Sequence, residues 1–268
     1  MDSLVMVLGA FALIFLIYLV GSFVITPASH FDAVFRLGEL NRIKQTGPGF
    51  VWLGLERRER YPTGSTQIEV PDEENRIDWE NKNPESGKTK PYRVPHRGME
   101  EAEFYRRKNP ADPNADPANP DEYEIVGFMD LDPDTREAMK KDNLHVALTS
   151  EMTVAIEYQL KGQDFVSVLE FITNVRPVGG RNREAEILKR LIDQGSKALV
   201  AVTGRSTLGH VKDNIELFST LLRRKLEVIV GERRSGQWTE SEKAEKADAP
   251  WGIYLNTATI KAPSAGQR

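Results

Sequence analysis

The side chains best suited to proton transfer in this 268-residue chain are four scattered histidines, His30, His96, His145 and His210. A side-chain nucleophile needs a base within hydrogen-bond reach, and no paired motif surrounds any of the four. No G-x-S-x-G, H-E-x-x-H or Walker sequence occurs. His145 falls at an outward position of a strand pattern, where a surface or packing role is the simpler interpretation. The sequence therefore predicts no catalytic residues.

Metal and phosphate chemistry also lack a complete motif. Asp130, Asp132 and Asp134 have the spacing that opens a calcium loop, but Pro133 interrupts it and the required glycine and distal glutamate are missing. The glycine-rich stretch "VGGRN" at residues 178–182 lacks the ending of a phosphate loop and is read as a turn. There are no cysteines to hold zinc or an iron–sulfur cluster. We expect no metal site and no cofactor.

Composition narrows the class of partner. The formal net charge of -4 and the pI near 5.7 disfavour nucleic acid, which requires a concentrated basic surface. At 30.2 kDa the chain is long enough for one large domain or two small ones.

An uncharged apolar run extends from Leu4 to Ile25. Its length of roughly 22 residues, at about 1.5 Å per residue, matches a hydrocarbon core of roughly 30 Å and predicts a membrane-spanning helix ended by Pro27. A cleaved signal peptide and a buried core helix are the alternatives. Basic residues follow the run and none precedes it, so we expect a single-pass protein with its folded part in the cytoplasm. The predicted anchor residues are Leu4, Val5, Phe11, Leu13, Ile14, Phe15, Leu16, Ile17, Tyr18, Leu19, Phe23 and Ile25.

The first elements after the apolar run are predicted to be short strands at 34–40 and 50–55, joined by a turn at Gly47, Pro48 and Gly49. Residues from about 61 to 122 are rich in proline and acidic side chains, which predicts an extended or partly ordered insertion with one strand at 66–70. The insertion is either a plain solvated loop or an element that docks a partner.

The second half of the chain alternates strand and helix patterns. Residues 142–160 predict two strands or one long bent strand, and 251–260 predict a closing strand. Apolar spacing predicts helices at 165–172, 184–202 and 213–230, with Gly204 as a helix stop and Thr207 as a cap. We expect an α+β fold of mixed strands and helices. The last helix is a candidate lateral interface or a core element, through Phe218, Leu222, Arg223, Arg224, Leu226 and Ile229.

Several segments, in this order, resemble the SPFH or band 7 superfamily of stomatins, prohibitins, flotillins and the bacterial HflK and HflC proteins. After the apolar run come "AVFRLGEL" and "GPGF", then "KKDNLHVALTSEMTVAIEYQL". "ALVAVTGRSTLGHV" and "WGIYLNTATI" complete the set, so that the resemblance covers about residues 4–56 and 130–260. The domains it implies are an anchor at 1–27, a band 7-like domain at 28–260 with its insertion at about 61–122, and a tail at 261–268.

The resemblance implies a membrane-anchored, non-enzymatic scaffold that oligomerises at the bilayer surface and either organises a membrane microdomain or regulates a membrane protease. Its implied partners are membrane lipids, SPFH-like subunits of the same or another kind, and a membrane protease. Phe35, Leu37, Gly38, Gly47, Pro48 and Gly49 would form the membrane-proximal strand and turn. Relatives commonly continue into a coiled coil that joins subunits into rings, and the sequence to Arg268 has none, so ring assembly stays open.

Two other functions stay open. One is a membrane-bound hydrolase, or a subunit of one, whose site in the insertion uses His96 and Glu100. The other is a monomeric adaptor that displays the acidic insertion to a basic partner.

Overall fold

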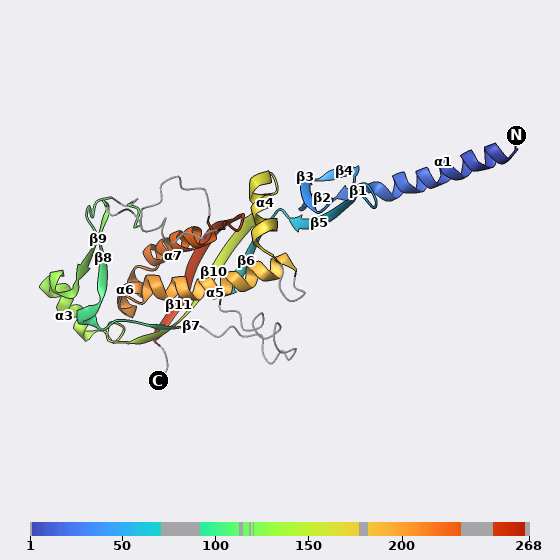
Figure 1. Ribbon diagram of the computed structural model, residues 1–268. Helices are drawn as coiled ribbons and strands as arrows, with labels where there is room; N and C mark the ends of the chain where they lie inside the picture. The colour runs from blue at the N-terminus through green and yellow to red at the C-terminus, as the bar shows by residue number, and fades with distance from the viewer. Residues whose placement is uncertain are drawn as a thin grey trace, which may run out of the picture.

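The computed structural model describes residues 2–70, 92–112, 115–117, 119, 121–176, 182–231 and 249–265. These residues form an elongated α+β structure, from one end of which helix α1 projects (Figure 1). The helices are α1 (Asp2–Ser22), α3 (Pro133–Lys141), α4 (Phe165–Asn174), α5 (Arg183–Thr203), α6 (Leu208–Asp213) and α7 (Ile215–Val230). The strands are β1 (Phe23–Thr26), β2 (His30–Arg36), β3 (Glu39–Lys44), β4 (Gly47–Phe50), β5 (Glu56–Pro62), β6 (Ser65–Val70), β7 (Tyr92–Pro95), β8 (Glu103–Arg107), β9 (Tyr123–Gly127), β10 (Thr149–Leu160) and β11 (Ile253–Ala265). Short 3₁₀ helices occupy Met99–Glu101 and Phe128–Asp130.

Strand β10 is the centre of the main sheet. It pairs antiparallel with β11 on one side and with β6 and β7 on the other. The alternation of Met152, Val154 and Ile156, all fully buried, is what the sequence pattern predicted for a half-buried strand. Residues 142–148 do not continue that strand, because the Asp142 carboxylate accepts the Leu144 N–H at 2.8 Å and turns the backbone. Of the two alternatives for residues 142–160, two strands or one long strand, the structure has one strand, β10, which begins only at Thr149.

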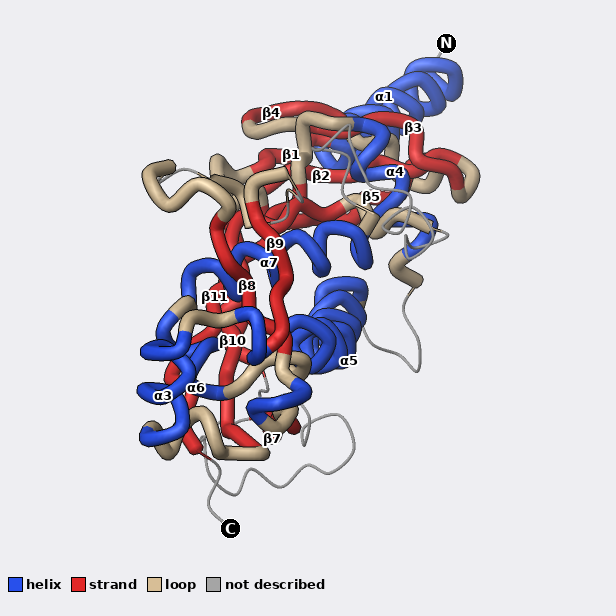
Figure 2. Tube along the Cα trace, turned by 90° about the vertical axis from the view of Figure 1, so that its left-hand side faces the viewer, coloured by secondary structure: helices blue, strands red, loops and turns tan. Residues whose placement is uncertain are grey.

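Helices α5 and α7 pack against this sheet and against each other, as Figures 1 and 2 show. Helix α5 begins where the Asn182 side chain accepts the Ala185 N–H at 2.8 Å, and Gly204 ends it as predicted. The Thr207 side chain caps α6, also as predicted. Gly195 allows the close approach of α5 to β6, since an added Cβ would lie 3.3 Å from Val70 Cγ2. The core between helices and sheet is continuous.

The N-terminal strands form a second, smaller unit. β2 pairs with β3 and β5, and β1 pairs with β4 in a separate two-stranded ribbon. The predicted strand 34–40 is divided, because Leu37 and Gly38 have positive φ and reverse the chain between β2 and β3. The turn predicted at Gly47, Pro48 and Gly49 is wrong, because these residues belong to strand β4, which pairs with β1.

The predicted strand 50–55 is wrong beyond its first residue. Backbone N–H groups of Leu55 and Glu56 both donate to the Trp52 carbonyl oxygen, at 3.1 and 2.8 Å. These bonds, with positive φ at Gly54, make residues 51–55 a turn. We call residues 51–55 the tryptophan turn.

The opposite end of the molecule carries a satellite unit made of β8, β9, the 3₁₀ helices and α3 (Figure 1). Ala102, Phe104, Val126 and Phe128 form its small core. The predicted insertion at about 61–122 therefore contributes ordered strands β6, β7 and β8. Strand 66–70 is confirmed, and residues 71–91 lie outside the described part of the chain.

The membrane-spanning prediction is overturned. Among the residues whose side chains the structure describes, no helix is both long and apolar enough to cross a membrane. The apolar run from Leu4 to Ile25 is split, because α1 ends at Ser22 and Phe23 begins strand β1. The predicted single-pass localisation fails with it. The first domain expected at residues 1–27 is therefore not a continuous helix, since α1 ends at Ser22.

Candidate interaction surface

Helix α1 carries large apolar side chains on its outer surface. The exposed ones among the predicted anchor residues are Phe11, Leu13, Ile14, Phe15, Leu16 and Ile17. Tyr18 and Leu19 are half-buried, and the side chains of Leu4 and Val5 lie outside the described ones. Soluble monomers rarely expose contiguous apolar patches above a few hundred Å², so a surface of this kind marks an interaction site.

The apolar surface continues from α1 into the ribbon and the tryptophan turn. Tyr18 stacks on Trp52 with ring centroids 6.1 Å apart, and Phe23 meets Phe50 edge-on at 5.7 Å. The exposed large apolar residues of this region are Phe23, Ile25, Phe50, Trp52, Leu53 and Leu55. We call α1 together with these six residues the apolar end.

A buried charge cluster fixes the ribbon to the rest of the N-terminal unit. Asp32 has no exposed surface, and its carboxylate accepts hydrogen bonds from Thr26 Oγ1 at 2.6 Å and Arg60 Nε at 2.8 Å. Arg58 lies 3.8 Å from the same carboxylate. Burial alone would raise the pKa of Asp32, but the bonds from Arg60 and Thr26 outweigh it and hold that pKa below its ordinary value. Asp32 is therefore ionised and paired.

Hydrogen bonds extend this cluster to the end of α1. The Lys44 ammonium donates to Thr26 Oγ1 at 2.7 Å and to the Gly47 carbonyl. The Val51 N–H donates to the Ser22 carbonyl at 2.8 Å, and the Leu53 N–H to Ser22 Oγ at 3.3 Å. Helix α1 thus leaves the domain through a bonded junction, which gives the apolar end a defined direction.

The predicted membrane-proximal residues separate in the structure. Phe35 is a buried residue of β2 that packs in the core, whereas Leu37 is 92% exposed at the tip of the β2–β3 reversal. Gly47, Pro48 and Gly49 lie in the ribbon beside β1 and so adjoin the apolar end.

The predicted lateral interface is mostly core. Phe218, Leu222 and Leu226 have no exposed surface and pack in the main core, so no partner can touch them in this fold. Ile229 packs partly buried against the same core. Arg223 Nε donates to Glu227 Oε1 at 2.9 Å, and Arg224 is half-buried. The apolar stripe of α7 is present as predicted. The main sheet covers it, so α7 is the core element and not the lateral interface.

The buried histidines form hydrogen bonds inside the fold. His96 Nδ1 faces the Ser206 carbonyl at 2.9 Å, so it carries the proton, and Nε2 accepts the Ser150 hydroxyl at 2.7 Å. This serine–histidine pair resembles a nucleophile and its base, and sequence reasoning missed it because the two lie far apart in the chain. Ser150 has no exposed surface, however, so a substrate cannot reach its hydroxyl. Burial lowers the pKa of His96, and Glu100 is an exposed residue outside the pair.

Two other chemical candidates have structural roles. The Asp132 side chain caps α3 by accepting the Thr135 N–H at 2.8 Å, which explains the acidic spacing that resembled a calcium loop. His145 is buried, contrary to the outward position predicted for it, because residues 142–148 turn instead of forming a strand. Its Nδ1 lies 2.8 Å from Thr207 Oγ1. Within the described residues, no group of three or more acidic or histidine side chains could hold a metal ion.

No protein-family model matches the chain, and no curated protein matches it significantly.

Proposed function

We propose that the protein is a non-enzymatic scaffold that binds a lipid bilayer surface through its apolar end and assembles with further copies or similar subunits. The observation that carries this proposal is the continuous apolar surface of α1, the ribbon and the tryptophan turn. The motif order quoted above, which resembles that of SPFH proteins, supports the assembly part.

Lipid is the occupant favoured by the shape of the apolar end. The exposed side chains surround α1 instead of forming one stripe, whereas a helix that docks in a protein groove needs only one apolar face. Transfer of apolar surface out of water is favourable by roughly 25 cal/mol per Å², so several large side chains entering lipid supply substantial affinity. Crossing of the bilayer is not part of the proposal.

Assembly follows from attachment to a surface. Molecules confined to a plane have a raised effective concentration, so weak side-to-side contacts suffice to associate them. The bonded junction around Asp32 would hold every copy in one orientation relative to the surface. A membrane protease is a further partner that the resemblance suggests.

The hydrolase alternative is less well supported. Its proposed residues His96 and Glu100 are not brought together by any contact in the described structure, and the hydroxyl that does meet His96 is inaccessible. The adaptor alternative predicts a monomer.

Vesicle flotation tests lipid binding. The full-length chain, diluted from mild detergent into liposomes of zwitterionic and anionic lipid, should float with them. Ile25→Ser combined with Leu55→Ser removes two exposed apolar side chains of the apolar end and should lower the floated fraction. Val146→Ser with Leu148→Ser is the matched control, since these residues are similarly exposed near β7, at the opposite end from α1 (Figure 1). Equal flotation of both double variants would count against the proposal.

Cross-linking with mass measurement on the same liposomes tests assembly. The scaffold proposal predicts species above the monomer mass that persist at low protein-to-lipid ratio. If the protein binds the liposomes but only monomers are found, the result would contradict the scaffold and favour the monomeric adaptor.

A further inference from the structure

The two edges of the main sheet differ in how they are protected. Along β11, helix α7 packs against the strand and the Ile260 N–H donates to Ser219 Oγ of α7 at 3.1 Å, so the helix satisfies at least one backbone group of this strand. On the other side, β6 pairs with β10, and no other strand pairs with β6 in the described parts of the chain. Its sequence, "STQIEV", contains neither lysine nor proline, and its one charged residue, Glu69, is paired with Lys261 of β11, so the usual devices that discourage pairing at an edge are weak here. The β6 edge is therefore able to accept another strand.

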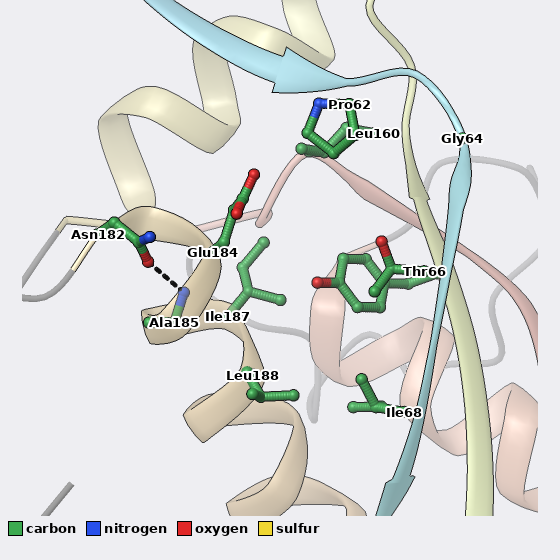
Figure 3. A pocket seen from close by; sticks show the side chains of 11 residues that line it. Pro62, Gly64, Thr66, Ile68, Leu160, Asn182, Glu184, Ala185, Ile187 and Leu188 are labelled. Atoms are coloured by element: carbon green, nitrogen blue, oxygen red, sulfur yellow. Dashed lines mark hydrogen bonds between the residues drawn. The ribbon is translucent and has the colours of Figure 1, made fainter. Parts of the chain in front are cut away.

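A groove lies beside this edge, between β6 and the first turns of α5. Its volume is about 390 Å³, and Thr66, Ile68, Glu184, Ile187 and Leu188 are among its lining residues. Figure 3 shows Ile68 of β6 opposite Ile187 and Leu188 of α5, with Glu184 above them at the mouth. Ile187 is buried at the base, while Ile68 and Leu188 are half-buried. The groove can hold a branched apolar side chain.

The floor of the groove adds a neutral hydrogen-bond donor. Tyr158 on β10 is opposite Thr66 in the sheet register and only 6% exposed. Burial, with a further contribution from the charge of Glu184, raises the pKa of Tyr158 to about 12 against the opposing effect of a hydrogen bond with the Thr66 side chain, so the phenol keeps its proton at neutral pH.

The charge at the mouth is negative. Glu184 is exposed, and no cation of the described residues forms an ion pair with it. Its neighbours on α5 are engaged elsewhere: Arg183 with Glu59, and Glu186 with Arg190 at 3.1 Å. A ligand that carries a positive charge beside an apolar group would match this arrangement.

We propose that β6 and the adjoining groove bind an extended peptide segment of a partner protein, which adds as a strand to the β6 edge, places a branched apolar side chain in the groove and pairs a lysine or arginine with Glu184. In this mode the main-chain hydrogen bonds provide affinity, and the pocket for alternate side chains provides specificity. Strands added to a sheet lie about 4.8 Å apart, and alternate side chains point to the same face, so one apolar residue and a basic residue two positions away both face α5. This site is independent of lipid binding and would let a scaffold recruit a client.

The test uses full-length protein in mild detergent and fluorescein-labelled hexapeptides. The first peptide carries valine and lysine two positions apart, so that both side chains point to the same face of the added strand, with threonine at the positions between them. The second has the same side chains but N-methylated amides on alternate residues, so it cannot form the ladder. We expect saturable binding of the first peptide, at least about tenfold weaker binding of the second, and slower hydrogen exchange of β6 amides in the complex.

Charge variants test the specificity. Glu184→Lys should lower the affinity for the lysine peptide about threefold to tenfold, an effect of order 1 kcal/mol. The same variant should prefer a peptide in which glutamate replaces the lysine. Glu216→Lys is the matched control, because Glu216 is likewise an exposed acid in the first turn of a helix, here α7, away from the groove. Circular dichroism verifies that both variants fold. Equal binding of the N-methylated peptide, no binding of either peptide at millimolar concentration, or an unchanged preference in Glu184→Lys would overturn the proposal.

Discussion

Protonation of His210 should destabilise the fold between pH 6.5 and pH 4. The ring is 7% exposed, and Phe104 and Phe218 lie edge-on to it with centroids 5.2 and 5.6 Å away. Its Nε2 accepts the backbone N–H of Tyr105 at 3.0 Å, so a proton added there would face another donor. Burial, and secondarily the charge of His145, lowers the pKa of His210 to about 4.

The sign and size of the effect follow from that pKa. In the unfolded chain His210 has its ordinary pKa of 6.5, so between pH 6.5 and 4 the unfolded state binds more protons than the folded one. Stability is therefore complete above pH 6.5 and decreases as the pH falls through this window. At about 1.4 kcal/mol per pKa unit, the contribution lost between pH 7 and pH 4.5 is about 2 kcal/mol.

Urea unfolding of the wild type and of His210→Gln at several pH values measures this contribution. Glutamine can still accept the Tyr105 N–H but does not titrate. Acidic groups with lowered pKa values, such as Asp32, contribute equally to both proteins and cancel in the difference. The wild type should lose about 2 kcal/mol more than the variant between pH 7 and 4.5. Parallel pH profiles would refute the assignment of a neutral, buried His210.

Three further substitutions test the packing described above, each by urea or thermal unfolding. Asp32→Ala should cost about 1–3 kcal/mol, because it leaves the buried Thr26 hydroxyl without its acceptor and removes the carboxylate that holds Arg60; a change below about 0.5 kcal/mol would contradict the cluster's role in the junction. Leu222→Ala should cost about 2–5 kcal/mol as a core cavity, whereas the exposed Leu37→Ala should stay within about 0.5 kcal/mol. Gly252→Ala should destabilise strongly, since φ is +68° and the added Cβ would overlap a backbone carbonyl, while Gly64→Ala, with open space around it, should be tolerated.

Local periodicity predicted helices α4, α5 and α7 and strands β6, β10 and β11, whereas most of the short N-terminal and satellite strands were not predicted. The alternation around Val154 and the helical spacing of 184–202 each describe a face that must be buried, and the caps at Gly204 and Thr207 obey backbone chemistry confined to a few residues. The α+β class followed from these elements. The Gly-Pro-Gly segment was misjudged because glycine and proline favour turns on average, whereas here pairing with β1 holds the segment extended.

Properties that depend on distant segments could not be predicted. The stripe of α7 gave no sign of whether a partner or the sheet would cover Phe218 and Leu222, because both occupants require the same spacing. The His96–Ser150 pair joins residues 54 positions apart. The open β6 edge became visible only when the partner of each strand was known.

The most direct test of the central claim compares two tryptophans in liposomes whose acyl chains carry bromine. In single-tryptophan variants of the full-length chain, Trp52 of the tryptophan turn and Trp251 of the main core serve as probe and control. If the apolar end enters lipid, brominated lipid quenches Trp52 strongly and leaves Trp251 unaffected. Unquenched Trp52 in protein that remains folded would contradict lipid binding through the apolar end.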